Sequence, residues 1–124
     1  MLESKHGIIG LAIGDAMGVP IEFHKREDLK QNPITEMTGY GSHNMPKGTW
    51  SDDTSMTLAT MDAIIEKKDI DLETIANNFC EWNINSKYTA TGRLFDIGAT
   101  TSQALSEFYW RRERCTALWE RYRI

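Results

Sequence analysis

The sequence predicts an all-α fold, and two observations carry that prediction. Apolar side chains recur at steps of three and four residues in several stretches of the 124-residue chain, which is the spacing of one helix face. No stretch alternates β-branched and polar residues as a half-buried strand would, and no segment repeats. Four helices are therefore expected in one domain: residues 4–18, residues 51–68, residue 72 to near residue 82, and residue 99 or 100 onward.

The first predicted helix carries glycines on one face, at Gly7, Gly10, Gly14 and Gly18. A glycine inside a helix costs roughly 1 kcal/mol relative to alanine, so the pattern indicates that another backbone or a ligand comes close along this face. We expect a buried, tightly packed helix that leads into a carboxylate-bearing turn. Asp15 interrupts the apolar stretch and could fix the following loop by hydrogen bonding, and we assign it no catalytic role.

The segment between the first two helices, residues 23–50, is punctuated by prolines and glycines and is predicted to be a loop. Loops of this length are usually functional or disordered. The second helix should begin at Ser51 and end at Lys67 and Lys68, whose charges suit a helix C-terminus.

The third helix should be capped by Asp71 and should place Leu72, Ile75 and Phe79 on one apolar face. Residues 83–97 are predicted to form a turn region before the last helix.

The start of the second helix concentrates oxygen donors, because Ser51, Asp52 and Asp53 follow one another there. Hydroxyl and carboxylate oxygens are the ligands that Mg²⁺ prefers. The same residues are also ordinary at a helix N-terminus, where they cap free N–H groups and face the positive end of the helix dipole. Spacing alone leaves both interpretations open.

Three segments in the same order resemble the N-terminal portion of the ADP-ribosylglycohydrolase family. They are residues 10–18 with Pro20 and Glu22, residues 49–54, and residues 92–98 followed by Thr100 and Thr101. The resemblance implies an all-α orthogonal helical bundle, truncated here to its first helices, with two bound Mg²⁺ or Mn²⁺ ions. It also implies cleavage of the glycosidic bond that joins ADP-ribose to a protein side chain or a small acceptor.

The resemblance assigns roles to five residues. The metal ligands of the family fall on Ser51, Asp52 and Asp53, and its acidic residues near the substrate fall on Glu22 and Asp96. Glu22 is the first candidate for the general base or for stabilising an oxocarbenium-like transition state, and Asp96 is the second. Alternatively, Glu22 is a solvated loop acid and Asp96 caps the helix that begins near residue 99.

The family takes further metal ligands from a second acidic element, whereas this chain contains no aspartate after Asp96. Three hypotheses follow: a truncated Mg²⁺-dependent hydrolase, a non-catalytic remnant that still binds metal or ADP-ribose, and a subunit whose site is completed by a second chain. The substrate would be an ADP-ribosylated protein or a small ADP-ribose conjugate.

The tail after Tyr109 uses arginine without lysine, and the resemblance ends near Phe108. We therefore divide the chain into a family-like part, residues 1–109, and a divergent arginine-rich tail, residues 110–124. A shifted reading frame is one explanation. The other is a genuine helical tail with one apolar stripe formed by Leu105, Phe108, Cys115, Leu118, Trp119 and Tyr122.

Composition limits the remaining function classes. The formal net charge of −4 argues against general nucleic-acid binding. No apolar run of membrane-spanning length and no signal peptide is present, so a cytoplasmic location is expected. Cys80 and Cys115 lack metal-site spacing, and the three histidines are scattered, so a histidine metal cluster is not expected.

Overall fold

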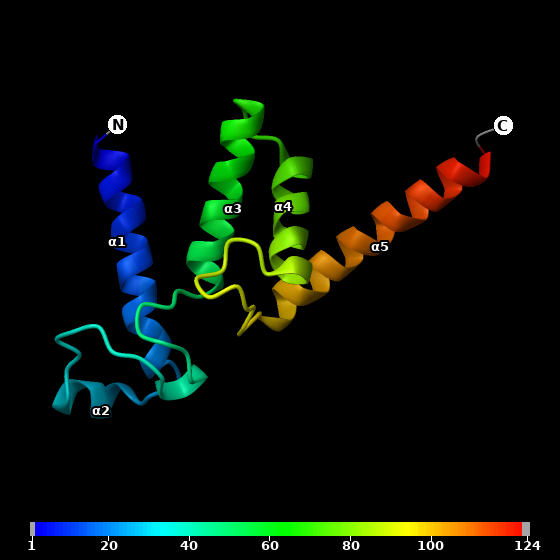
Figure 1. Cartoon of the computed structure of the whole chain (residues 1–124). Helices are drawn as coiled ribbons and strands as arrows, with labels where there is room; N and C mark the ends of the chain where they lie inside the picture. The colour runs from blue at the N-terminus through cyan, green and yellow to red at the C-terminus, as the bar shows by residue number, and fades with distance from the viewer. Residues whose placement is uncertain (1, 123–124) are drawn as a thin grey trace.

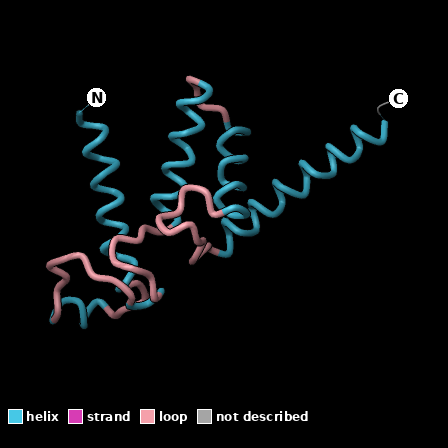
Figure 2. Tube along the Cα trace, in the orientation of Figure 1, coloured by secondary structure: helices cyan, strands magenta, loops and turns pink. Residues whose placement is uncertain are grey.

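The computed structural model describes the backbone of residues 2–122 and the side chains of residues 3–113. Within this part of the chain all regular structure is helical, apart from one isolated β-bridge between Tyr40 and Met45, which confirms the all-α prediction (Figures 1 and 2). The elements in chain order are α1 (Leu2–Gly18), η1 (Val19–Ile21), α2 (Arg26–Gln31), η2 (Gly41–His43), α3 (Asp52–Lys67), α4 (Leu72–Asn85) and α5 (Ala99–Tyr122).

Helices α3 and α4 form an antiparallel hairpin whose ends are set by local signals. Lys68 adopts a left-handed conformation and its N–H bonds to the carbonyl of Ile64, which ends α3. The Asp71 side chain accepts a hydrogen bond of 2.7 Å from the N–H of Thr74, which confirms the predicted cap of α4. Figure 1 shows α3 and α4 side by side, with α5 starting near the end of α4.

The hydrophobic core lies between this hairpin and the start of α5. Cys80, Trp82 and Leu105 are its buried members, and Trp82 is only 1% exposed. Ala59 and Ala63 of α3 have no exposed surface. Their small side chains allow α4 to pack closely against α3. The partly buried residues that pack against the core are Met56, Phe79, Tyr88, Leu94, Ile97 and Phe108.

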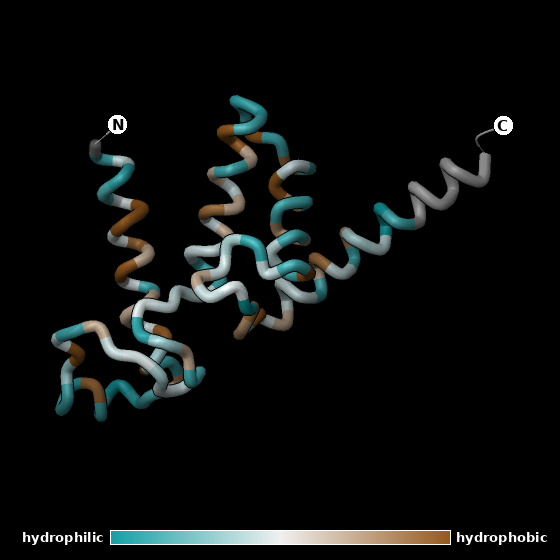
Figure 3. The backbone as a smooth tube through the Cα atoms, viewed as in Figure 1, coloured by the Kyte–Doolittle hydropathy of each residue, from teal (hydrophilic) through white to brown (hydrophobic). Residues whose placement is uncertain are grey.

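The expectation of a buried, tightly packed first helix was wrong. Of the described side chains of α1 only Ala16 is buried, and Ile9 is 56% exposed. Figure 3 shows apolar residues along the middle of this helix. No neighbouring atom lies within 4 Å of a Cβ built on Gly7, Gly10 or Gly14. The physical reason is that α1 contacts only η1 and α3 among the described elements, so nothing covers its length.

The two segments expected to be irregular contain more helix than predicted. Residues 23–50 include α2 and η2, and α4 continues to Asn85 before the connection to α5 begins. The start of α5 at Ala99 agrees with the prediction, and this helix runs without interruption across the division proposed at residues 109 and 110. Of the predicted apolar stripe, Leu105 and Phe108 join the core, and the side chains from Cys115 to Tyr122 lie outside the described residues.

None of the described helices combines the length and the hydropathy that crossing a membrane requires.

Candidate functional site

A cavity of about 780 Å³ lies where α1, the start of α3 and the loop before α5 meet. All five residues that the sequence singled out line it: Glu22, Ser51, Asp52, Asp53 and Asp96. They come from three segments that are far apart in the sequence, so the fold brings the three motifs to one place. Gly10, Gly14 and Gly18 line the same cavity, and the glycine face of α1 therefore borders this open space and not another backbone.

Asp15 joins α1 to the first turn of α3. One oxygen of its carboxylate, Oδ2, accepts hydrogen bonds from the N–H of Ser51 at 2.9 Å, the N–H of Thr54 at 3.2 Å and the Thr54 hydroxyl at 2.6 Å. Thr54 is 1% exposed, so these donors depend on Asp15 for a partner. Asp15 thus acts through hydrogen bonds, but its partners lie at the start of α3 and not in the loop that follows α1.

Ser51 is the N-cap of α3, which is one of the two interpretations that the sequence left open. Its hydroxyl oxygen accepts a hydrogen bond of 3.3 Å from the N–H of Asp53. The capping interpretation is therefore correct for Ser51, and it does not exclude cation binding, because a hydroxyl oxygen has a second lone pair.

The charges at this helix start repel one another. Burial raises the pKa of Asp52, and the neighbouring carboxylates of Asp53 and Asp96 raise it further, while hydrogen bonds from Ser51 and the backbone act in the opposite direction. A hydroxyl and two carboxylates with unfavourable mutual repulsion form an oxygen donor set that fits a hard divalent cation.

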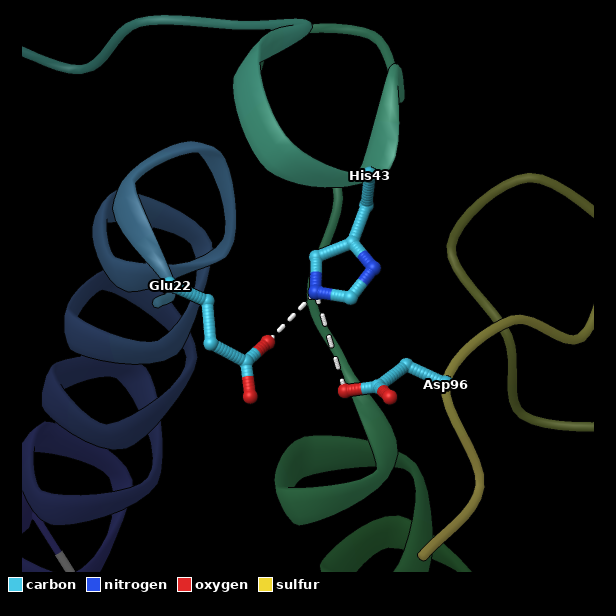
Figure 4. A group of neighbouring side chains, drawn as sticks. All are labelled: Glu22, His43 and Asp96. Carbon is cyan, nitrogen blue, oxygen red and sulfur yellow. Dashed lines mark hydrogen bonds and ion pairs between the residues drawn. The ribbon is translucent and has the colours of Figure 1, made fainter. Parts of the chain in front are cut away.

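Glu22 and Asp96 are brought together by a third residue, His43 of η2 (Figure 4). The Nε2 atom of His43 lies 2.5 Å from Oε2 of Glu22 and 3.7 Å from Oδ2 of Asp96. These three atoms lie within 4.8 Å of one another, which makes the group a possible cation site by distance alone.

The sequence did not indicate that His43 would join Glu22 and Asp96. Its position in the sequence gives no sign of the cluster, since it lies 21 positions after Glu22 and the chain between them includes a predicted loop. The glycines that precede it, Gly39 and Gly41, were the available signal, because glycines in a loop often mark a close backbone approach.

The loop that carries Asp96 is held against α3. Tyr88 donates its hydroxyl to Asp62 of α3 at 2.5 Å, and the carbonyl of Tyr88 accepts from the Trp50 indole N–H at 3.1 Å. The Ser86 hydroxyl accepts from the N–H of Leu94 at 3.1 Å. These bonds hold the loop against α3 and the end of α4 and place Asp96, whose φ of 51° is left-handed, at the cavity.

A model of the ADP-ribosylglycohydrolase family matches residues 4–120. The chain is 37% identical over 111 residues to an ADP-ribosylarginine hydrolase, Tri1, of Pseudomonas putida (strain GB-1), which covers 90% of this chain and 29% of that protein. It is 29% identical over 102 residues to the ADP-ribosyl-[dinitrogen reductase] glycohydrolase of Rhodospirillum rubrum, covering 81% of this chain and 32% of the relative. The chain thus spans less than a third of the length of these relatives.

Proposed function

This chain belongs to the ADP-ribosylglycohydrolase family, and from that premise we propose that its cavity is part of a site that binds ADP-ribose with a divalent cation and hydrolyses ADP-ribosyl bonds. The observation that carries the proposal is the convergence of three distant motifs on one cavity, with Glu22, Asp96 and the residues from Ser51 to Asp53 in its wall.

Ser51, Asp52 and Asp53 would hold Mg²⁺ or Mn²⁺, and the family resemblance implies two such ions. Their oxygen donors and the raised pKa of Asp52 support this assignment, because a cation would neutralise the repulsion among the carboxylates. When bound, the metal would polarise water and the oxygens of the substrate.

Glu22 is the proposed general base, with Asp96 as the second candidate. A carboxylate in this position takes a proton from the attacking water or stabilises positive charge that develops on the sugar. In the overall reaction a C–O bond forms at the anomeric carbon, the bond to the acceptor breaks, and the proton removed from water passes to the leaving group. The exposed glycine face at Gly10 and Gly14 leaves room for a ligand beside the backbone of α1.

We further propose a protein substrate in which ADP-ribose is attached to arginine. The support comes from two relatives whose names specify ADP-ribosylarginine and ADP-ribosylated dinitrogen reductase. Negative charge from Glu22, Asp52, Asp53 and Asp96 around the cavity suits a cationic guanidinium group.

Metal binding is tested on the 124-residue chain by titration calorimetry with Mn²⁺. Replacing Asp52 and Asp53 together by Asn should abolish the heat of binding and the Mn²⁺-dependent rise in melting temperature, because a ligand bound only by the folded state must stabilise it. Asp69→Asn is the matched control, since Asp69 is an exposed acid just beyond the other end of α3. Unchanged Mn²⁺ binding in the double variant would show that the site is assigned wrongly.

Turnover by the isolated chain is expected to be very low or absent. This expectation corresponds to the hypothesis of a non-catalytic remnant that still binds metal or ADP-ribose. Three protein oxygens leave most of the coordination sphere of a cation to water, and each 1.36 kcal/mol of lost transition-state stabilisation is a tenfold loss of rate. ADP-ribose release should be assayed on ADP-ribosyl-arginine, ADP-ribosyl-serine and O-acetyl-ADP-ribose. Strong metal-dependent release that is lost in Asp53→Ala would contradict this expectation and would favour a second chain that completes the site.

A further inference from the structure

The backbone around His43 is docked tightly on the segment that carries Glu22. The Ser42 hydroxyl donates to the carbonyl of Glu22 at 2.5 Å and lies 3.3 Å from the carbonyl of Pro20. A Cβ added to Gly41 would lie 2.0 Å from the Pro20 carbonyl oxygen, so only glycine permits this approach. The distance between η2 and the end of η1 is thus fixed by the Ser42 hydroxyl and by the close approach of Gly41, independently of the His43 side chain.

The ring of His43 then lies beside two other aromatic rings. The side chain is 12% exposed, and its ring centroid lies 5.8 Å from that of Phe23 and 5.3 Å from that of Phe95. Phe23 follows Glu22 and Phe95 precedes Asp96, so the ring contacts the neighbour of each candidate catalytic acid. Phe23 and Asp96 both have positive φ values, 68° and 51°, which are uncommon for residues with a side chain.

The polar edge of the same ring faces both carboxylates. Nε2 lies at hydrogen-bond distance from Glu22 and somewhat farther from Asp96, and Figure 4 shows the second oxygen of Glu22 pointing away from the ring. The separation of 2.5 Å between Nε2 and Oε2 is a direct and short hydrogen-bond contact. Because a carboxylate oxygen accepts hydrogen bonds, Nε2 is the donor.

We propose that His43 is a positioning residue of the site: its Nε2–H holds one oxygen of Glu22 and leaves the other oxygen directed away from the ring for water or substrate. This inference rests on the proposed role of Glu22. His43 acts through Glu22 and has no direct part in the reaction. The ring contacts with Phe23 and Phe95 set the direction of the donor.

Two variants separate the donor from the ring, and a third variant is the control. His43→Phe keeps an aromatic ring between Phe23 and Phe95 and removes the donor. His43→Gln keeps an N–H donor and removes the ring. His24→Phe is the control, because His24 is exposed and does not line the cavity. All are compared by thermal melting, by Mn²⁺ titration and by ADP-ribose titration in the presence of Mn²⁺.

We expect His43→Phe to weaken ADP-ribose binding about tenfold, as loss of a charge-assisted hydrogen bond commonly does, while Mn²⁺ affinity stays unchanged. His43→Gln should restore part of the loss. In a Glu22→Gln background, His43→Phe should change the affinity by less than about twofold, because the two residues act as one unit. An equal loss in both backgrounds would overturn the proposal, and a loss of Mn²⁺ binding in His43→Phe would identify His43 as a metal ligand instead.

Nitrogen-15 NMR of the histidine side chains decides the question even where ADP-ribose does not bind. The signals of His43, assigned by their absence in His43→Phe, should show a protonated Nε2 and should shift in Glu22→Gln, while those of His6 and His24 stay in place. Signals of His43 that do not respond to Glu22→Gln would overturn the proposal. ADP-ribose binding that is absent from the wild-type chain, with the His43 signals still responding, would count against the proposed function alone.

Discussion

The α3–α4 hairpin and helix α1 are held in the structure by different kinds of interaction. The hairpin encloses apolar side chains together with the start of α5, and Trp82 at its centre is 1% exposed. Helix α1 buries only Ala16 among its described side chains, and it is joined to α3 mainly through the carboxylate of Asp15. The hydrophobic core thus lies in one region, whereas the candidate site lies at a junction made largely of polar contacts.

This difference separates stability from site assembly. Burial of apolar surface is the dominant favourable term in folding, so the hairpin should determine whether the chain folds. The junction should determine whether the residues from Ser51 to Asp53 face α1 across the cavity. Substitutions in the hairpin should therefore lower folding stability most, whereas substitutions at the junction should mainly impair ligand binding.

The largest effect is expected for Trp82→Ala, which removes the most buried large side chain of the core. Truncation of a buried aromatic residue costs about 3–5 kcal/mol, which is a large part of the total stability of a small domain. Urea denaturation followed by circular dichroism measures the loss. Leu72→Ala is the matched control on the same helix, because Leu72 is 76% exposed. A similar loss in both variants would mean that α4 is not stabilised by this core.

Asp15→Ala is expected to cause a smaller loss of folding stability, together with a loss of Mn²⁺ binding. The substitution leaves the donors of Ser51 and Thr54 without their shared acceptor, at a cost of about 1–3 kcal/mol. Mn²⁺ binding should be lost as well, because α1 no longer fixes the start of α3. Calorimetry and urea denaturation on one sample test both effects. Retained Mn²⁺ affinity despite the lost stability would show that α3 forms the cation site without α1.

Asp52→Asn is expected to change the melting temperature least, and the direction of that change depends on whether Mn²⁺ is present. Because the folded-state pKa of Asp52 is raised by burial and by Asp53, its ionised form destabilises the folded chain, and metal-free protein should gain stability as the pH falls toward that pKa. Asp52→Asn should therefore slightly raise the metal-free melting temperature at neutral pH and flatten its pH dependence. With Mn²⁺ the order should reverse, since only the wild-type chain gains from the ion. A lower melting temperature of the metal-free variant would contradict this account.

The parts of the fold that the sequence predicted correctly depend on local interactions. The caps at Ser51 and Asp71 each depend on residues within one turn of the helix end, and the start of α5 at Ala99 matches one of the two predicted positions. The convergence of the five site residues was expected only from the family resemblance, because no local pattern places Asp96 near Glu22.

The parts that were missed depend on distant contacts or on the lack of them. The apolar and glycine-rich pattern of α1 indicated burial, yet burial requires a neighbouring element, and none covers its length in the described structure. His43 joins Glu22 only because Gly41 and Ser42 dock on the segment that ends at Glu22. Neither outcome could be obtained from hydrophobic periodicity, which reports which face is apolar and not what lies against it.

The three hydrogen bonds to a single oxygen of Asp15 also couple the docking of α1 to the first turn of α3. Their donors, at Ser51 and Thr54, lie close together when that turn is formed, so α1 docks on the helical form of this segment. Release of α1 should accordingly be a local opening with a lower free energy than global unfolding, in which the hairpin persists. In hydrogen exchange, the amides of Ser51 and Thr54 should open together and faster than the core of α4. A ligand that touches both α1 and α3 would slow that opening.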